Sequence, residues 1–236
     1  MEVYDPLADA WSDCTPMLTV RSGHSLCASS GGSMFAIGGC DASSNLLSSV
    51  ERYDAAQDRW TEVQPMPAAR SSHGVCAAGD DIYVIGGIVD HVGISATVLK
   101  YSVSSNTWTE AGNMPSARYR LCVCVLGTHI YCIGGDDGQD LSVVERYDTE
   151  SGVWSTLAPM PTAREGAAAF VLEGKIYVYG GVVDCVGGTD VVERYDPVSG
   201  AWDTVSSLPG GRAFGVGCSV RSEVNYFDSL LSGGRD

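Results

Sequence analysis

The sequence predicts an all-β fold in which short strands repeat in units of four. First, a Tyr, a Trp and an Arg each recur five times with the same steps of 49, 48, 46 and 48 residues. The Trp series, for example, is Trp11, Trp60, Trp108, Trp154 and Trp202. Second, each unit holds an apolar run that stops at a glycine doublet: Gly38–Gly39, Gly86–Gly87, Gly134–Gly135 and Gly180–Gly181. Third, no long segment has helical periodicity. A period of about 50 residues with four strands in each unit is typical of a β-propeller.

One unit, residues 164–202, shows how the strands are expected to follow one another. A run of small and apolar residues should form the first strand, and Ile176–Tyr179 the second. Because Ile176–Tyr179 is apolar at every position, both faces of that strand should be covered. Val191–Tyr195 should form the third strand and, after a turn rich in Asp, Pro, Ser and Gly, Trp202 should lie on the fourth. The glycine doublets should supply positive φ at the ends of the second strands, and the Trp side chains should bring apolar area to the seams between units.

The repeat boundaries divide the chain into four whole units and two halves. The whole units are expected to be four-stranded antiparallel blades at residues 21–66, 67–114, 115–160 and 161–208. Residues 1–20 match the C-terminal half of a unit, because Glu2–Asp5 aligns with Glu51–Asp54. Residues 209–229 match an N-terminal half, with Val224–Phe227 in place of the second strand, and 230–236 should be a tail. We therefore predict a single domain, residues 1–236, in which the two halves form a composite fifth blade that closes the ring.

The repeated pattern resembles the kelch repeat. The matching elements are Arg followed by His or a small residue, Ile-Tyr-x-x-Gly-Gly, Val-Glu-Arg-Tyr-Asp, Trp and Pro-Met-Pro, in four full and two partial copies. The resemblance implies a kelch-type propeller like those of BTB–kelch and F-box–kelch proteins, acting as a protein-interaction module and as a substrate adaptor of a ubiquitin ligase. Kelch rings more often have six or seven blades. A piece of a larger ring is therefore an alternative to a closed, monomeric five-bladed domain.

The charge balance disfavours several kinds of partner. The chain carries 29 acidic against 14 basic side chains, for a net charge of −15. Nucleic acids and anionic lipid surfaces require basic patches, so we expect neither. No apolar run approaches the about 18 residues of a membrane-spanning helix, and the acidic N-terminus is not expected to be a signal peptide.

The nine cysteines are expected to be free thiols. Four of them share one repeat position, six residues after the Arg: Cys27, Cys76, Cys124 and Cys218. Equivalent positions on neighbouring blades should lie beyond the about 7 Å between Cα atoms that a disulfide permits. They are therefore interpreted as small buried residues of the first strand, in a protein of the reducing cytoplasm.

The repeated arginines are the main candidate binding residues. One per unit, they should form a ring at the channel mouth, and a guanidinium suits carboxylates, phosphates and carbonyl oxygens. The members are Arg21, Arg70, Arg118, Arg164 and Arg212, with Arg120 as a second cation beside Arg118. The kelch resemblance implies that these positions, and those of Ser49 and Thr97, line a pocket for a partner protein or acidic peptide. The alternative is that each Arg pairs with an acid or a strand-end carbonyl of its own or the next blade.

No catalytic residue, cofactor site or metal site is predicted. His24 and His73 each follow their Arg by three residues, and a structural role is favoured over a metal pair. Residues 136–140 lack the alternating ligands of a calcium loop. Two other functions stay open: a propeller enzyme of the sugar epimerase or oxidase type, whose sugar site could use Arg164 and Glu165, and an actin-binding cytoskeletal protein.

Overall fold

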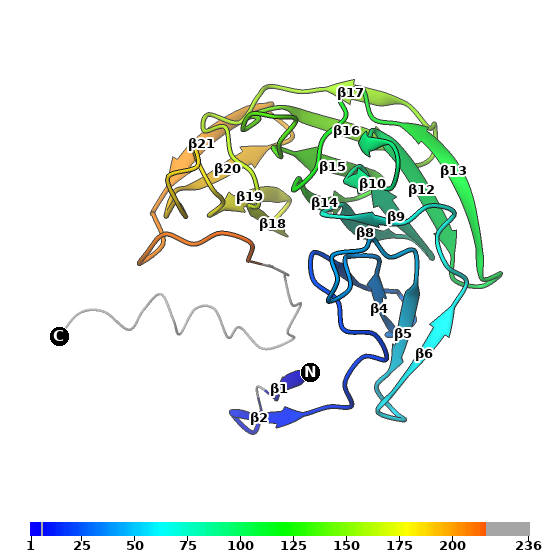
Figure 1. Ribbon diagram of the computed structural model, residues 1–236. Helices are drawn as coiled ribbons and strands as arrows, with labels where there is room; N and C mark the ends of the chain where they lie inside the picture. The colour runs from blue at the N-terminus through cyan, green and yellow to red at the C-terminus, as the bar shows by residue number, and fades with distance from the viewer. Residues whose placement is uncertain (6, 216–236) are drawn as a thin grey trace.

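The structure, a computed structural model, describes residues 1–5 and 7–215. Figure 1 shows four sheets that follow one another around an arc, with the first strand of each sheet innermost. Each sheet has four strands, antiparallel and paired in chain order. This arrangement confirms the predicted all-β fold class of four-stranded blades. None of the described residues forms a helix that could cross a membrane.

The strands of the four blades follow the repeat. Blade 1 consists of β3 (Ser25–Ala28), β4 (Met34–Ile37), β5 (Val50–Asp54) and β6 (Arg59–Val63). Blade 2 consists of β8 (Gly74–Ala78), β9 (Asp81–Ile85), β12 (Thr97–Ser102) and β13 (Thr107–Asn113). Blade 3 consists of β14 (Cys122–Leu126), β15 (His129–Ile133), β16 (Val144–Asp148) and β17 (Trp154–Thr156). Blade 4 consists of β18 (Ala168–Leu172), β19 (Lys175–Tyr179), β20 (Val192–Asp196) and β21 (Ala201–Val205).

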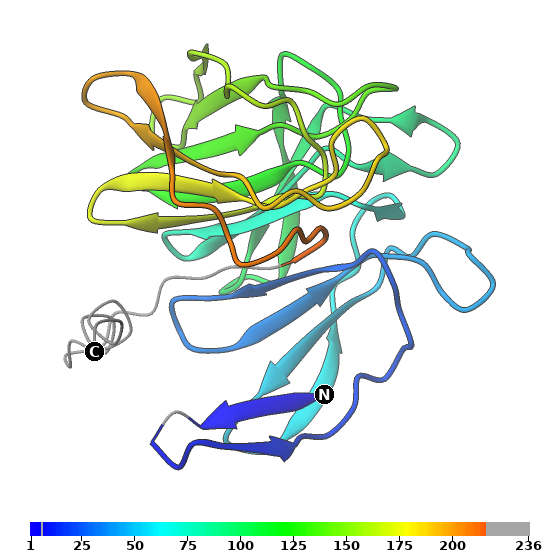
Figure 2. The same cartoon turned by 90° about the vertical axis from the view of Figure 1, so that its left-hand side faces the viewer.

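Two smaller sheets accompany the blades. In blade 2, β10 (Ile88–Val89) and β11 (Gly93–Ile94) come from the loop after the glycine doublet and form a three-stranded sheet with β7 (Arg70–Ser71), which precedes the first strand. At the N-terminus, β1 (Glu2–Asp5) pairs with β2 (Ala10–Asp13). Figure 2 shows this hairpin at one end of the molecule, next to blade 1.

The glycine doublets lie where neighbouring blades touch. Gly38 and Gly39 have φ values of 59° and 97°, and the other three doublets have similar values. A Cβ on Gly38 would lie 2.5 Å from the backbone oxygen of Arg70 in the next blade. The first glycine of every doublet faces the corresponding Arg carbonyl in the same way. The prediction of positive φ is confirmed, and the close backbone contact across the seam explains why a side chain is excluded.

The hydrophobic core is a series of seams between blades. Each seam packs second-strand residues of one sheet against those of the next, as Ile85 of blade 2 packs with Ile130 of blade 3. Trp108, Trp154 and Trp202 pack at the edges of three seams, as predicted. Three indoles also donate from Nε1 to a carbonyl oxygen of the preceding segment at 2.9–3.0 Å: Trp60 to Thr15, Trp108 to Gln64 and Trp202 to Ala158.

The composite blade is described only in part. The hairpin β1–β2 has the predicted half-blade form, with Tyr4 opposite Trp11 as Tyr53 is opposite Trp60. Residues 212–215 follow blade 4. Cys218, the Val224–Phe227 strand and the 230–236 tail lie outside the described residues, so the fifth blade and the nine-thiol count stay predictions.

Candidate functional site

Three of the repeated arginines are buried in ion pairs inside their own blades. Each guanidinium meets a Glu of the third strand at 2.5–2.6 Å: Arg21 with Glu51, Arg118 with Glu145 and Arg164 with Glu193. The paired side chains are at most 1% exposed. The expectation that these three guanidinium groups face a ligand at the channel mouth is therefore wrong. The sequence alternative, an ion pair within the blade, is what the structure shows.

Further hydrogen bonds tie each Arg–Glu pair to the surrounding backbone. Arg21 Nη1 donates to the carbonyl oxygen of Gly38 at 2.8 Å, so the pair also fixes the end of the second strand. The carboxylate accepts from the segment that precedes the Arg: Leu18 N and Thr19 N on Glu51, Ser116 Oγ on Glu145, and Thr162 Oγ1 on Glu193. Burial alone would raise the pKa of Glu51, but hydrogen bonds from Arg21 and the backbone hold that pKa below its usual value. Each pair thus connects the third strand, the end of the second strand and the segment that precedes the first strand.

Arg70 occupies the same repeat position without a carboxylate. Leu99 stands where the other blades have Glu51, Glu145 and Glu193, and Ala68 stands where blades 3 and 4 have a hydroxyl. The Arg70 side chain is still buried, and its Nη1 donates to the Gly86 oxygen at 3.2 Å. Its Nε is buried without a partner. Because burial disfavours the charged form, the pKa of Arg70 falls to about 10.

The remaining predicted site residues fall into two groups. Ser49 and Thr97 are half-buried and hydrogen-bonded within the blades, Ser49 Oγ to Arg21 Nη2 at 3.1 Å and Thr97 Oγ1 to Ser95 Oγ at 2.9 Å. Arg212 and Arg120 are exposed. Arg120 and Arg212 are therefore the predicted cations that stay accessible among the described residues, whereas the five repeated arginines do not form one ligand-facing set.

A different repeat position lines a cavity on the inner side of the blades, and the sequence analysis did not identify it as a set, although Arg120 was a candidate. Two residues after each Arg lies a residue with φ between 52° and 59°: Gly23, Ser72, Arg120, Gly166 and Phe214. We call these five residues the inner ring. From Ser72 to Phe214, the N–H of each one donates to the carbonyl oxygen of its counterpart in the preceding unit, at 2.7–2.9 Å. The two glycines were the available signal, but the five residue types differ too much for the sequence to reveal a shared conformation.

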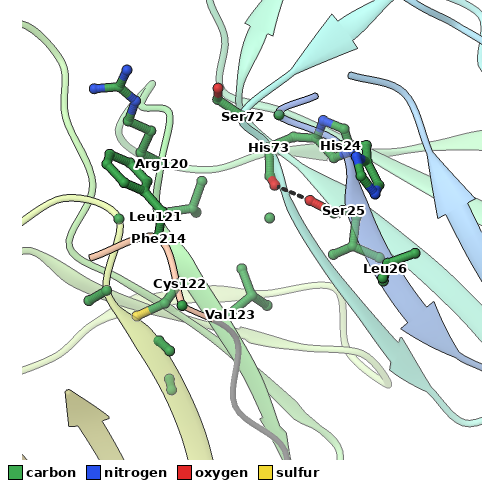
Figure 3. Close-up of a pocket in the computed structure, with 18 residues that line it drawn as sticks. His24, Ser25, Leu26, Ser72, His73, Arg120, Leu121, Cys122, Val123 and Phe214 are labelled. Carbon is green, nitrogen blue, oxygen red and sulfur yellow. Dashed lines mark hydrogen bonds between the residues drawn. The ribbon is translucent and has the colours of Figure 1, made fainter. Parts of the chain in front are cut away.

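The inner ring opens onto a cavity of about 680 Å³. Its wall consists of the inner ring and the residues that lead into the first strands. Figure 3 shows His24, Ser25, Ser72 and His73 on one side, and Arg120, Cys122 and Phe214 on the other. Ala167, Ala168 and Ala169 extend the apolar side. The cavity thus has histidine and serine side chains, beside Leu26 and Val75, on the side of blades 1 and 2, and mainly apolar residues on the side of blades 3 and 4.

Arg120 stands at the mouth of this cavity between two aromatic rings. Its Cζ lies 5.2 Å from the ring centroid of Tyr119 and 5.3 Å from that of Phe214. Its Nη1 donates to both carboxylate oxygens of Glu165 at 2.8 Å, and these bonds raise the pKa of Arg120. The Arg120 side chain is 39% exposed, so the guanidinium is held in place while part of it faces solvent. Tyr119, Arg120, Glu165 and Phe214 are called the Arg120 cluster below.

Acidic side chains lie next to the Arg120 cluster. Carboxylate oxygens of Asp136, Asp140 and Glu165 all lie within 4.8 Å of one another. The sequence analysis considered Glu165 with Arg164 in a possible sugar site, but it did not predict that Glu165, from the start of the next unit, lies beside Asp136 and Asp140. The Arg120 guanidinium supplies positive charge to this group, since it is bonded to both oxygens of Glu165.

The histidines of the cavity wall are uncharged at neutral pH. His73 is buried, and neither of its ring nitrogens has a hydrogen-bond partner. Burial, with the Arg70 charge nearby, lowers the pKa of His73 to about 3. The pKa of His24 is also lowered, chiefly by burial and then by Arg21. Both side chains therefore face the cavity region as neutral imidazoles.

The described cysteines are free thiols: Cys14, Cys27, Cys40, Cys76, Cys122, Cys124, Cys132 and Cys185. Cys76 and Cys124, at the repeat position six residues after the Arg, pack in the seams as small apolar residues. Burial raises the pKa of Cys27 and of Cys122 to about 12. Because the thiolate is the reactive form, these thiols are poor nucleophiles.

Comparison with known proteins gives the following matches. A family model described as the KLHDC2/KLHL20/DRC7 Kelch-repeats domain matches residues 2–181, and one described as the Kelch motif matches residues 163–209. A solved structure described as "Structure of YjhT" has a TM-score of 0.78 and 17% sequence identity to this chain, covering 89% of this chain and 77% of that chain. At that identity the likeness concerns the fold alone. No curated protein matches.

Proposed function

Since the chain belongs to the kelch-repeat family, we propose that it is a protein-interaction module that binds a partner protein or acidic peptide at the Arg120 cluster. The observation that carries the proposal is the exposed guanidinium held between Tyr119 and Phe214 at the cavity mouth. Arginine and large aromatic residues dominate the binding energy of protein interfaces. A rigid scaffold that holds them in place reduces the entropy lost on binding.

The hydrogen bonds of Arg120 leave part of the guanidinium for a partner. Glu165 accepts from Nη1 alone, and among the described residues Nε and Nη2 make no hydrogen bond. A partner carboxylate could therefore bind Nη2 and Nε while Glu165 keeps the side chain oriented. The net charge of −15 repels an acidic partner at long range. We therefore expect slow association that depends on this local cation.

A more specific version of this proposal is that the chain is a substrate adaptor of a ubiquitin ligase. Kelch domains of BTB–kelch and F-box–kelch proteins present substrates to ubiquitin ligases, and the same use of this face would make the partner a ligase substrate. Support for this step comes from family membership, whereas the Arg120 cluster supports partner binding itself.

The test compares Arg120→Gln with Arg59→Gln. Arg59 is an exposed arginine on β6, the outermost strand of blade 1, so the control makes the same charge change away from the cavity. Both variants and the wild type are titrated with a library of acidic and phosphorylated peptides and with the matched amide library. We expect Arg120→Gln alone to weaken the acidic binders, by about 1.5–3 kcal/mol. Equal affinities of the two variants for every acidic binder would refute the proposal.

A further inference from the structure

Arg70 keeps only one of the two contacts that position the buried arginines of blades 1 and 4. In those blades Nη1 donates to the carbonyl oxygen of the first doublet glycine, and Nη2 meets the third-strand carboxylate. Arg70 Nη1 donates to the Gly86 oxygen at 3.2 Å in the same way. Among the described residues, none accepts a hydrogen bond from Arg70 Nη2. The nitrogen that meets a carboxylate in blades 1 and 4 is therefore the one that lacks a partner in blade 2.

The side chains that replace the missing acceptors of blade 2 are apolar. Leu99 stands at the position of the third-strand Glu, and Ala68 at that of the hydroxyl residue two positions before the Arg. Each is smaller than its counterparts in the other three blades by at least one non-hydrogen atom, and neither can form a side-chain hydrogen bond. These two differences remove oxygen atoms from beside the guanidinium, and no described side chain accepts a hydrogen bond from it instead.

No charged group of the described residues neutralises Arg70. The repeated arginines of blades 1, 3 and 4 each form an ion pair, whereas Arg70 forms none. His73 is close enough for the Arg70 charge to lower its pKa, and it is uncharged at neutral pH. Arg70 is only 2% exposed, so bulk water does not solvate its charge. A buried charge is costly unless a counter-charge pairs with it, and a water molecule would satisfy only the hydrogen bond.

We propose that Arg70 binds a small monovalent anion, of the size of chloride, which occupies the position of the missing third-strand carboxylate in blade 2. Arg70 Nη2 is the main donor to this anion. Thr97 is the second, because it stands at the repeat position of Ser49, whose Oγ accepts from Arg21 Nη2 at 3.1 Å. The hydroxyl of Thr97 lies 2.9 Å from Ser95 Oγ. That hydrogen bond uses one of the two hydroxyl protons and leaves the other for the anion.

The burial of the site determines the size and charge of its ligand. A side-chain carboxylate of a partner protein needs an open surface, and Arg70 is almost fully buried. A divalent anion would leave one negative charge unpaired beside the single guanidinium. The net charge of −15 repels every anion at long range. We therefore expect a weak complex, with a Kd for chloride of about 10 mM.

Urea denaturation tests the site, because guanidinium chloride would itself add the ligand. Sodium gluconate, whose anion is too large for the site, keeps the ionic strength constant while sodium chloride replaces it. With a Kd of about 10 mM, the folding equilibrium constant of the wild type should rise about tenfold between about 1 and 100 mM chloride. Arg70→Met should abolish this rise. The control Arg59→Gln, which removes an exposed charge from β6, should keep it.

A second variant tests the position of the anion. Leu99→Glu places a carboxylate of the chain itself beside the guanidinium, so it should compete with chloride and also abolish the rise. Equal chloride responses of the wild type, Arg70→Met and Arg59→Gln would indicate a general salt effect and overturn the proposal. A wild type that does not respond to chloride would overturn it as well, with water as the occupant of the site.

The wild type alone also decides the question if a variant misfolds. Crystals grown in sodium bromide should show an anomalous bromide peak beside Arg70 Nη2, because bromide has the charge of chloride and nearly its size. Bromide peaks at exposed arginines such as Arg59, with none beside Arg70, would mean an adventitious ion only and refute the proposal. Either result leaves the proposed role of Arg120 unchanged.

Discussion

Arg118 in blade 3 and Arg70 in blade 2 occupy the same repeat position, but only Arg118 has a carboxylate beside its guanidinium. Glu145 accepts from Arg118 at 2.6 Å, and Ser116 Oγ completes the site. Around Arg70 the corresponding residues are Leu99 and Ala68. Leu99 instead joins the apolar seam with Phe35 and Ile37 of blade 1.

The difference shows that the arginine alone does not determine what its position does. The residue on the third strand decides whether the charge is neutralised inside the blade. In blade 2 the carboxylate and the hydroxyl are absent together, and the seam gains apolar contacts in exchange. Arg70 then keeps a buried charge with one carbonyl hydrogen bond. We expect this charge to cost stability rather than supply it.

The largest expected effect is the loss of one member of a complete pair. Arg118→Ala leaves Glu145 charged, buried and without its cation, so the free energy of unfolding should fall by about 3–5 kcal/mol. Arg70→Met removes a charge that has no carboxylate, so it should change that free energy by less than about 1 kcal/mol or raise it. Chemical denaturation of both variants measures the difference. Equal losses would show that the carboxylate is not what separates the two blades.

Much of this fold could be predicted because the repeat itself carries the information. The second strands, the positive φ of the glycine doublets and the place of Trp108 and Trp202 at the seams all follow from one pattern copied four times. Each copy confirms the alignment of the others, so a local ambiguity in one unit is resolved by its neighbours.

The candidate site was harder to predict because it depends on distances between units. The acids that neutralise Arg21, Arg118 and Arg164 were visible in the Val-Glu-Arg-Tyr segments, but spacing alone did not show that they point at the arginines. The inner ring was missed because its shared feature is a backbone conformation. The contact of Arg120 with Glu165 and Phe214 joins three units and has no local signal.

Introducing a carboxylate beside Arg70 in blade 2 should have the second largest effect on the free energy of unfolding. Leu99→Glu places a carboxylate where Glu145 lies in blade 3, beside the Arg70 guanidinium. The substitution should be tolerated with Arg70 present and strongly destabilising with Arg70→Met, because a buried acid without a cation costs several kcal/mol. A double-mutant cycle by denaturation should give a coupling free energy of about 2–3 kcal/mol. Additive effects of the two changes would mean that the side chains do not meet.

The smallest expected effect is a pH-dependent change in the free energy of unfolding that comes from His73, near Arg70. Three residues after Arg70 lies His73, where blade 3 carries the buried Leu121. The pKa of His73 is lowered to about 3 by burial, whereas an unfolded chain protonates histidine near pH 6.5. Between these values the unfolded state binds more protons, so the stability present above about pH 6.5 is lost as the pH falls towards about 3.

His73→Leu should remove this pH dependence. When the pH falls from 7.5 to 5.5, His73 alone should lower the free energy of unfolding of the wild type by about 1.4 kcal/mol. The decrease in the leucine variant should therefore be smaller than the decrease in the wild type by that amount. The matched control is His91→Leu, because His91 lies exposed on the loop of blade 2 beside Asp90. Denaturation curves of the three proteins at the two pH values give the comparison. If the leucine variant at position 73 kept the full acid sensitivity, then His73 would be protonated in the folded protein, and the seam around Arg70 would hold a second charge rather than a neutral ring.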